Sequence, residues 1–329
     1  MKILFIGGTG TISTAISRKL LAEGHELYLL NRGNRNAELP GAHFLIADVN
    51  DEKKVADLIK DLDFDVVADF IAFTPDQLER DFRLFNGKTR QFIFISSASA
   101  YQKPPENYII TEDTPLSNPF WEYSRNKIAC EEYLLKKYKE DKFPITIVRP
   151  SYTYDERVVP MSIHGERGSW QVLKRMLEGK KIIIHGDGTS LWTMTHTRDF
   201  AKGFVGLLGN PQTIGEAIQI TSDEVLTWNR IYECIAQALG VKLNAVHISS
   251  DCLADHCYFD LRSGLIGDKA NSVVFDNSKV KRLVPGFSAD IPFEQGIKET
   301  VDYILVHPEL QKIDKEFDSW CDKMINIYG

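Results

Sequence analysis

The residues best suited to chemistry in this sequence are Tyr123 and Lys127, which a helix would place on one face because they are four positions apart. A tyrosine has an ordinary pKa of about 10, and nearby cations lower that pKa by favouring the phenolate. Lys127 and an oxidised nicotinamide are the cations that we expect to act on Tyr123. Ser97, in an earlier serine cluster, is expected to hydrogen-bond and orient a substrate oxygen. The three residues predict hydride transfer from a secondary alcohol, with Tyr123 as the base.

A glycine-rich turn near the start of the chain is expected to hold the cofactor. The run GGTGTI occupies residues 7–12, between an apolar run and a helical pattern. Glycine permits a tight turn and a close approach of the backbone to a pyrophosphate, and the helix N-terminus offers N–H groups to the phosphates. Ser13 takes the third glycine position of the usual pattern, and as a small residue it still permits close packing. We therefore expect a dinucleotide site at Gly7, Thr9, Gly10, Thr11 and Ile12.

The end of the second expected strand bears on the choice between NAD and NADP. NAD sites usually carry an acidic residue here, whereas NADP sites prefer a cation for the extra phosphate. Asn31 and Arg32 occupy this place, so NADP is favoured over NAD, with Arg35 as a further cation. The alternative is that both arginines are solvated. Asp48, followed by Val49, is expected either to hold the adenine amino group or to cap a helix.

Apolar runs rich in Ile, Val and Phe alternate with helical patterns over the first 150 residues. This alternation is typical of an α/β fold with a doubly wound parallel sheet, the Rossmann arrangement. The expected strands are 2–6, 26–30, 43–46, 66–71, 91–95 and 145–148, and the expected helices are 11–23, 51–62, 75–86 and 121–139. Ligands bind at the carboxyl ends of such strands, which adds Phe70, Ile71, Ala72 and Ser96 to the expected cofactor site.

The later part of the chain has a looser pattern, with helices expected at 169–178, from 197, and at 227–239, 292–306 and 309–327. We expect a cofactor domain at 1–151, completed by about 197–221 and 273–284. The expected substrate lobe comprises 152–196, 222–272 and 285–329.

The chemical motifs, in order along the chain, resemble those of an extended short-chain dehydrogenase/reductase of the NAD-dependent epimerase/dehydratase type. The motifs are the glycine turn, Ser96-Ser97 with Tyr101, Tyr123 with Lys127, Arg149-Pro150, and the run HTRDFA at 196–201. The resemblance implies Ser97, Tyr123 and Lys127 as the catalytic residues, with Tyr123 and Lys127 also touching the cofactor. It further implies that Pro150 and Ser151 lie beside the nicotinamide, and we expect Tyr152 after them to touch the cofactor as well.

Two departures from the family pattern concern the substrate. Tyr152 stands where nucleotide-sugar epimerases usually carry an asparagine, and Trp192 stands where they often carry an arginine for the diphosphate. The expected substrate residues are therefore Ser97, Tyr123, Tyr152 and Trp192, and the substrate is a carbohydrate or a nucleotide-sugar-like alcohol. Release of the hydride on the cofactor would give dehydrogenation, and its return would give epimerisation or dehydration.

Composition narrows the remaining classes. The net charge of −7 argues against a nucleic-acid binder, and no apolar run is long enough to span a membrane. The five scattered cysteines predict free thiols and a cytoplasmic protein, and no metal site is expected. A homodimer paired through the helix of Tyr123 and a monomer fit equally well.

A rival interpretation comes from a second resemblance. The segment 30–33 and the stretch 149–152 are similar to an atypical branch of the family that includes chloroplast stem-loop-binding proteins. The chain would then be an RNA-binding or regulatory protein that uses the dinucleotide as a structural or sensing ligand. The presence of Tyr123 favours an enzyme over this alternative.

Overall fold

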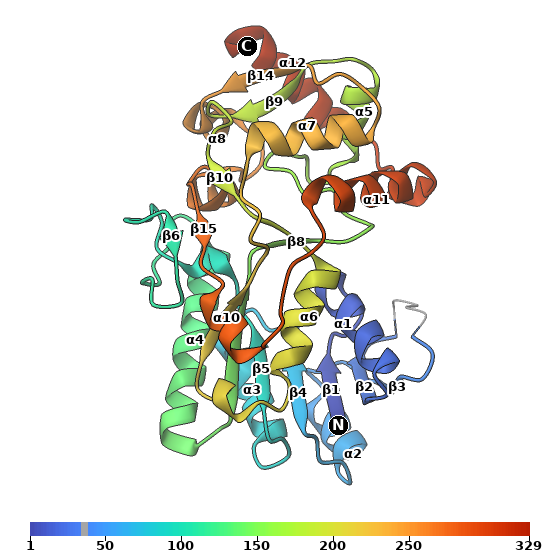
Figure 1. The fold of residues 1–329 in the computed structure, drawn as a ribbon, viewed down its shortest axis with the longest axis vertical. Helices are drawn as coiled ribbons and strands as arrows, with labels where there is room; N and C mark the ends of the chain where they lie inside the picture. The colour runs from blue at the N-terminus through green and yellow to red at the C-terminus, as the bar shows by residue number, and fades with distance from the viewer. Residues whose placement is uncertain (34–38) are drawn as a thin grey trace.

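A seven-stranded parallel sheet forms the lower half of the molecule in Figure 1. The structure is a computed structural model, which describes residues 1–33 and 39–329, so Arg35 lies outside the described residues. The strand order is β12-β7-β5-β4-β1-β2-β3. The strands are β1 (Lys2–Ile6), β2 (Glu26–Asn31), β3 (His43–Ile46), β4 (Val66–Asp69), β5 (Phe92–Ile95), β7 (Ile145–Pro150) and β12 (Ala217–Ile220). The predicted α/β doubly wound sheet is confirmed.

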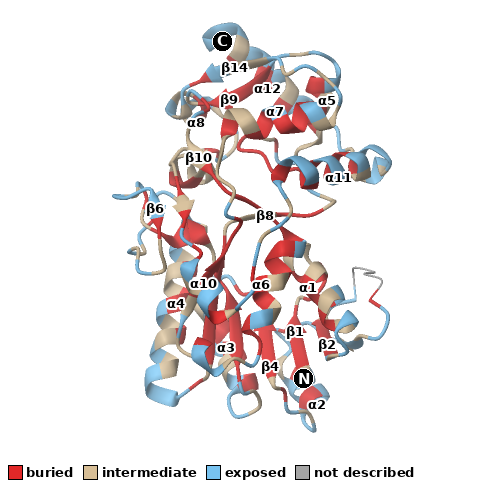
Figure 2. Ribbon diagram, viewed as in Figure 1, coloured by how far each residue is buried: buried red, intermediate tan, exposed pale blue. Residues whose placement is uncertain are grey.

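The central strand β1 is apolar because both of its faces are covered. Ile3 and Phe5 belong to one buried cluster, and Leu4 and Ile6 belong to another. Successive side chains of a strand point to opposite faces, so a strand between two helical layers has no polar side. One layer consists of α1 (Thr11–Ala22), α6 (Thr197–Leu207) and α10 (Ser278–Leu283), and the other of α2 (Glu52–Ile59), α3 (Pro75–Phe85) and α4 (Glu122–Asp141). Figure 2 shows the buried strands between these layers.

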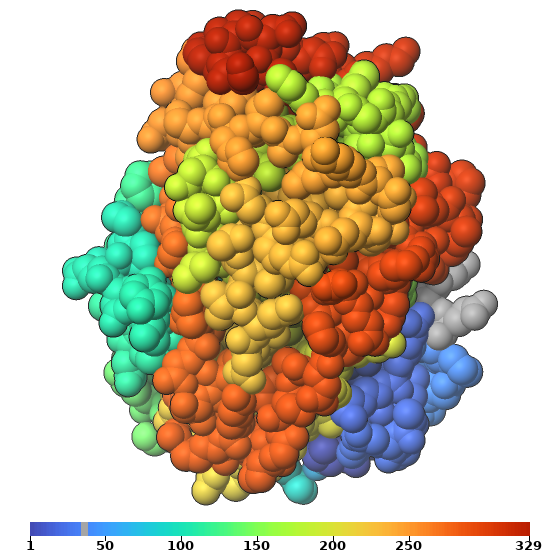
Figure 3. Space-filling view, turned by 45° about the horizontal axis from the view of Figure 1, so that its top comes forward, coloured from blue at the N-terminus to red at the C-terminus, as the bar shows by residue number. Residues whose placement is uncertain are grey.

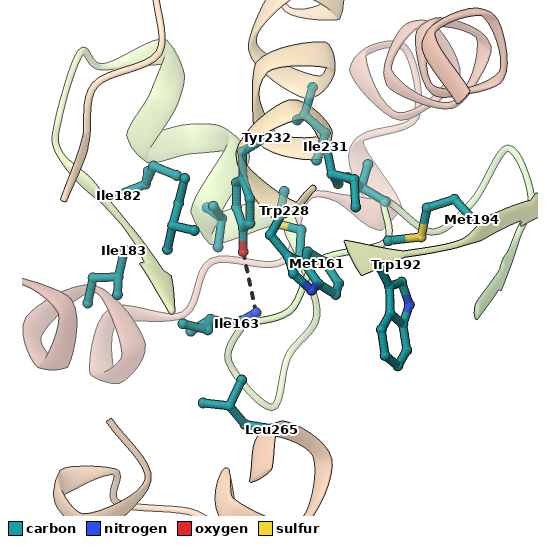
Figure 4. Close-up of a cluster of buried hydrophobic side chains, with 14 of the residues drawn as sticks. Met161, Ile163, Ile182, Ile183, Trp192, Met194, Trp228, Ile231, Tyr232 and Leu265 are labelled. Carbon is teal, nitrogen blue, oxygen red and sulfur yellow. Dashed lines mark hydrogen bonds between the residues drawn. The ribbon is translucent and has the colours of Figure 1, made fainter. Parts of the chain in front are cut away.

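A second core lies above the sheet and is built from the later part of the chain, as Figure 1 shows. Its helices are α5 (Trp170–Leu177), α7 (Trp228–Ala238), α8 (Ser250–His256), α9 (Arg262–Gly264), α11 (Phe293–Leu305) and α12 (Lys315–Tyr328). Its paired strands are β9 (Ile182–His185) with β14 (Ala245–Ile248), and β10 (Leu191–Trp192) with β13 (Leu226–Thr227). Figure 4 shows Trp192, Trp228 and Tyr232 inside this core, with the Ile163 N–H donating to the Tyr232 hydroxyl.

Short paired strands connect the two halves. They are β8 (Tyr152–Tyr154) with β11 (Met194–His196), and β6 (Ile109–Ile110) with β15 (Val274–Phe275). Three short turns, η1 (Ala98–Ala100), η2 (Pro211–Thr213) and η4 (Pro308–Leu310), and the π-helical turn η3 (Leu265–Lys269) complete the described elements. In Figure 3 the orange segment around α10 and the start of α11 lies against both the gold segment of α7 and the blue N-terminal segment.

Two predicted boundaries are wrong for local reasons. The predicted strand 66–71 ends at Asp69, whose carboxylate accepts the backbone N–H groups of Ile71 and Ala72 and so turns the chain out of the sheet. The predicted helix 309–327 begins only at Lys315. Asp314 caps that helix by accepting from the Phe317 N–H at 3.1 Å, because a carboxylate satisfies the free N–H groups of a first turn.

Candidate active site

The glycine turn between β1 and α1 requires glycine at two positions for reasons within the protein. Gly7 has a φ of +83°, and a Cβ there would overlap Cγ2 of Ile71. A Cβ on Gly8 would overlap the side chain of Leu29. Gly10 differs, because a Cβ there would meet only the Ser13 Oγ at 3.4 Å. The protein itself therefore leaves room at Gly10, and glycine at this position fits a turn that a ligand approaches closely.

Ser13, in the third glycine position, closes the turn. Its Oγ accepts from the Gly10 N–H at 2.8 Å and donates to the Gly7 carbonyl at 3.0 Å. The first N–H groups of α1, from Thr11 onward, have no partner within the helix. These groups carry partial positive charge and point out of the helix end, which fits a phosphate.

A cleft of about 650 Å³, here called the larger cleft, opens beside this turn. It contains eleven residues of the predicted cofactor site: Gly7, Thr9, Gly10, Thr11, Ile12, Asn31, Arg32, Asp48, Val49, Phe70 and Ile71. Sequence reasoning missed Ser13, Leu30, Gly33, Ala47, Asn50, Phe73, Gln77, Arg80 and Ile95. Position at a strand end could have indicated Leu30, Ala47 and Ile95. Gln77 and Arg80 lie on α3 and gave no such signal.

Asn31 presents a hydrogen-bond donor to the larger cleft. Its side-chain oxygen accepts from the Gly33 N–H at 2.9 Å, which turns the amide so that its buried Nδ2 has no partner within the described part of the chain. Arg32 beside it is exposed. Asp48 accepts from the Asn50 N–H at 2.9 Å and so makes a local turn at the rim. An unpaired donor beside a cation fits an acceptor-rich ligand.

Arg80 closes the floor of the larger cleft with two buried carboxylates. Its guanidinium lies 2.7 Å from Asp81 and 3.6 Å from Asp69. Burial and the neighbouring Asp69 raise the pKa of Asp81. One cation between two carboxylates rigidifies this floor.

Lys127 lies beneath the site and lines neither cleft. Its Nζ donates to the carbonyl oxygens of Ala72 at 2.8 Å and Ile95 at 2.7 Å. Burial lowers the pKa of Lys127 to about 8. An ammonium group has three donors, so one remains for a further acceptor. Ala72, predicted to touch the cofactor, instead supplies its carbonyl to Lys127.

Tyr123 lies between the rings of Phe73 and Trp121, whose centroids are 6.1 Å and 5.0 Å from its own. Burial raises the pKa of Tyr123, and a hydrogen bond with Ser97 opposes that rise. The Lys127 Nζ lies 5.7 Å from the centroid of the Tyr123 ring, yet burial dominates. In the chain alone the pKa of Tyr123 is raised; the expected lowering by Lys127 together with an oxidised nicotinamide stays a prediction.

The serines after β5 divide between two environments. The Ser97 hydroxyl lies 2.9 Å from that of Ser99, which also accepts from Ser124 at 2.8 Å. Ser96 was predicted to touch the cofactor, but its hydroxyl donates to Glu131 in the interior. Ser96 is not among the described lining residues of the larger cleft, and its contact with a cofactor stays a prediction.

A second cleft of about 370 Å³, here called the smaller pocket, shares Ile12 with the larger cleft. It is lined by Ile12, Ser97, Ala98, Ser99, Trp121, Tyr123, Pro150, Ser151, Tyr152, Thr153, Trp192, Asp268, Lys269 and Phe275. Every predicted substrate residue is therefore in it. Trp121, Asp268 and Lys269 were missed, and His164, considered as a lining residue, is not among them. The Trp192 Nε1 is buried without an acceptor in the described ranges.

Comparison with known proteins decides the family. The model of the NAD dependent epimerase/dehydratase family matches residues 3–233. The chain belongs to that family. It is 24% identical over 288 residues to 2'-dehydrokanamycin reductase of Streptomyces kanamyceticus, covering 87% of this chain and 80% of that protein. It is 28% identical to a chloroplast stem-loop binding protein of 41 kDa of Arabidopsis thaliana, covering 73% and 63%.

Solved structures confirm the fold of this family member. A UDP-glucuronic acid 4-epimerase from Bacillus cereus, in complex with UDP-glucuronic acid and NAD, superposes with a TM-score of 0.73 at 20% identity. The alignment covers 93% of this chain and 99% of that one. No helix in the described residues is long and apolar enough to cross a membrane. In the same residues, no group of three or more His, Cys, Asp or Glu side chains is placed to hold a metal ion.

Proposed function

We propose that this protein catalyses hydride transfer between a carbohydrate-like alcohol and a nicotinamide cofactor. The observation that carries the proposal is the position of Ser97 and Tyr123 in the smaller pocket, which meets the larger cleft at Ile12. A dinucleotide lying on the glycine turn would reach the smaller pocket at that junction. The substrate carbon would then face both the reactive end of the cofactor and the tyrosine hydroxyl.

Each of the three residues has a separate task in this proposal. The Tyr123 phenolate removes the hydroxyl proton of the alcohol, while Ser97 hydrogen-bonds the same oxygen. Lys127 holds its two carbonyls and directs its third N–H toward the cofactor ribose. The nicotinamide, when bound, accepts the two electrons with the hydride and supplies positive charge that favours the phenolate. The alcohol becomes a carbonyl, and the reverse steps reduce it.

We further propose NADP as the preferred cofactor over NAD. The support is Arg32 at the end of β2, next to Asn31, whose side-chain Nδ2 has no partner within the described residues. An acidic residue in this place would repel the extra phosphate of NADP. Whether the hydride leaves on the cofactor or returns to the substrate is an experimental question. An absorbance scan of the purified protein distinguishes the two, because an enzyme that recycles its hydride retains bound cofactor.

The experiment that tests the proposed function is Tyr123→Phe, assayed against a panel of sugar alcohol and carbonyl substrates with both cofactors. Loss of the base is expected to reduce kcat by about 10²- to 10⁴-fold, with cofactor affinity unchanged. The matched control is Tyr133→Phe on the same helix, which lies outside both clefts and is expected to retain wild-type turnover. Wild-type activity in Tyr123→Phe would contradict the mechanism.

RNA binding is the second candidate, because one relative carries a stem-loop binding name. A filter-binding titration at several salt concentrations tests it. Sub-micromolar RNA affinity with a steep salt dependence would support this candidate. The arrangement of Ser97 and Tyr123 around one pocket favours the enzyme, since RNA binding needs neither residue.

A further inference from the structure

We propose that the smaller pocket selects a compact substrate carrying one anionic oxygen group, a carboxylate or a phosphate monoester, which binds at Lys269. This inference rests on the proposed function, because it concerns the substrate of the same site. Lys269 comes from the turn η3, far along the chain from Tyr123, yet both residues line this pocket. No sequence motif marked Lys269.

The Lys269 ammonium lies between aromatic walls. Its Nζ is 5.6 Å from the ring centroid of Trp121 and 5.6 Å from that of Tyr152. Its one hydrogen bond within the described ranges is to the Gly264 carbonyl at 3.2 Å. Two of its three donors are therefore available to a ligand. Trp121 packs against Tyr123, so a ligand of sugar size can touch both the ammonium and the tyrosine hydroxyl.

The charge balance leaves this ammonium for an anion. Asp268 and Lys269 are the only charged residues among the described lining residues of the smaller pocket. Asp268 has another cation, because its carboxylate lies 3.6 Å from the Nζ of Lys103, whose side chain is 1% exposed. Lys103, Asp268 and Lys269 together carry one formal positive charge. A group of opposite charge in this partly enclosed pocket would gain more than it would in water.

The backbone of Lys269 is held from the second core, which indicates a built site. Its carbonyl lies 3.2 Å from Nε2 of His185 and accepts from Nε1 of Trp228 at 3.1 Å. Nδ1 of His185 lies 2.9 Å from the Ser162 hydroxyl, which lies 3.2 Å from that of Tyr232. If His185 is neutral and donates from Nε2, every hydrogen bond in this series has one donor and one acceptor. These contacts fix the direction in which η3 presents its lysine.

Size and lining favour a ligand smaller than a nucleotide diphosphate sugar. The smaller pocket measures about 370 Å³, at the low end of the usual range for ligand sites. Tyr152 and Trp192 add aromatic rings, and no further charge, to its lining. One lysine with aromatic walls suits one anionic group on an apolar-faced ring.

The test measures ligand binding without cofactor, from the fluorescence of Trp121 and Trp192. The ligands are D-glucuronate, D-glucose 6-phosphate, D-glucose and UDP-glucose. At least one of the two simple anions is expected to bind roughly tenfold to a hundredfold more tightly than glucose, the range for a charge-assisted hydrogen bond. Which of the two binds identifies carboxylate or phosphate as the natural group.

Three variants test whether Lys269 causes the preference for an anion over glucose. Lys269→Met is expected to abolish it, Lys269→Arg to retain it in part, and Lys242→Met, an exposed lysine in the same half of the molecule, to leave it unchanged. The inference is overturned if neither simple anion binds better than glucose. It is also overturned if Lys269→Met keeps the preference, or if UDP-glucose binds more tightly than both.

The same measurements separate this inference from the proposed function. Tyr123→Phe is expected to bind the anion like the wild type while losing turnover. Binding of the anion without turnover by any form of the protein would leave the anion site standing and reject the hydride transfer. Turnover of a neutral sugar, insensitive to Lys269→Met, would reject the anion site alone.

Discussion

The larger cleft takes its described lining from residues 7–95, whereas the smaller pocket collects its lining from segments spread between residues 12 and 275. The first is shaped mainly by backbone: a turn with a positive φ, a helix end and the ends of neighbouring strands. The second is shaped by side chains that several loops and short elements bring together. On the proposed function, a cleft shaped by the main chain would suit an invariant cofactor, and a pocket shaped by side chains would suit a substrate that differs between enzymes.

This difference predicts that the two sites tolerate change differently. In the larger cleft, substitutions should act through steric fit of the main chain. In the smaller pocket, they should act through the charges and hydrogen bonds that hold η3. Exchanging single residues in each site therefore tests the comparison directly.

Gly7 and Gly10 give the largest expected effect. Gly7→Ala forces a left-handed φ on alanine and overlaps Ile71, which should cost roughly 2–5 kcal/mol of folding free energy. Gly10→Ala has a compatible φ of −84° and meets only Ser13, so stability should be unchanged or raised by up to about 1 kcal/mol. Urea unfolding of the two variants measures this contrast.

The same pair also tests what the larger cleft binds. Gly10→Ala should fold like the wild type and lose about tenfold or more in dinucleotide affinity, because its methyl group would occupy the path of the pyrophosphate. Fluorescence titration with NADP and NAD reports the affinity. Undiminished affinity in Gly10→Ala would show that the turn does not contact a dinucleotide.

His185 tests the other half of the comparison, through pH. Burial lowers the pKa of His185 from about 6.5 to about 4, so the folded protein keeps this imidazole neutral where the unfolded chain binds a proton. The contribution of His185 to the free energy of unfolding is fully present above about pH 6.5. It is lost as the pH falls from about 6.5 to about 4, by roughly 3 kcal/mol in all. His185→Gln should remove that part of the pH dependence.

Urea unfolding at a series of pH values between 7 and 4.5 measures the effect as a difference between variant and wild type. Burial also lowers the pKa of His164 and His196, and both histidines are present in the two proteins, so their contributions cancel. An identical pH dependence in the wild type and His185→Gln would mean that the network behind Lys269 is not a neutral one.

Sequence reasoning finds about half of the lining of each site: eleven of the twenty described residues of the larger cleft and seven of the fourteen of the smaller pocket. The expected bounds of β1 and β3 are confirmed, since short apolar runs between turns leave little choice. The eleven predicted lining residues of the larger cleft are local to the glycine turn and to strand ends. Asp268 and Lys269, by contrast, look like any charged pair in a loop. Their position depends on a π-helical turn and on packing against Trp228, which no short pattern encodes.

Ser96 and Ser97 show the same limit within two residues. Both follow β5 and both are serines, so spacing alone cannot say that one faces Glu131 and the other the smaller pocket. The alternation of side chains at a strand end decides it, together with the demand of the buried Glu131 for donors. Arg149, whose guanidinium lies 2.6 Å from Glu131, is distant in sequence, and only the folded sheet brings that pair together.

The smallest expected effect concerns the exposed rim of the larger cleft. Arg32→Ser should raise the Kd for NADP by about tenfold and leave the Kd for NAD unchanged, because an exposed cation that contacts the extra phosphate contributes little more than about 1 kcal/mol.

Arg32→Lys keeps the charge and serves as the matched control. Titration of both cofactors into each variant gives the ratio of the two constants. A ratio that stays the same in Arg32→Ser would show that Arg32 does not select the cofactor. Asn31, whose amide is fixed by the Gly33 N–H, would then bind a ribose oxygen common to both cofactors. In that case binding at the rim of the larger cleft would depend on Asn31, whose side chain is oriented by the main-chain N–H of Gly33.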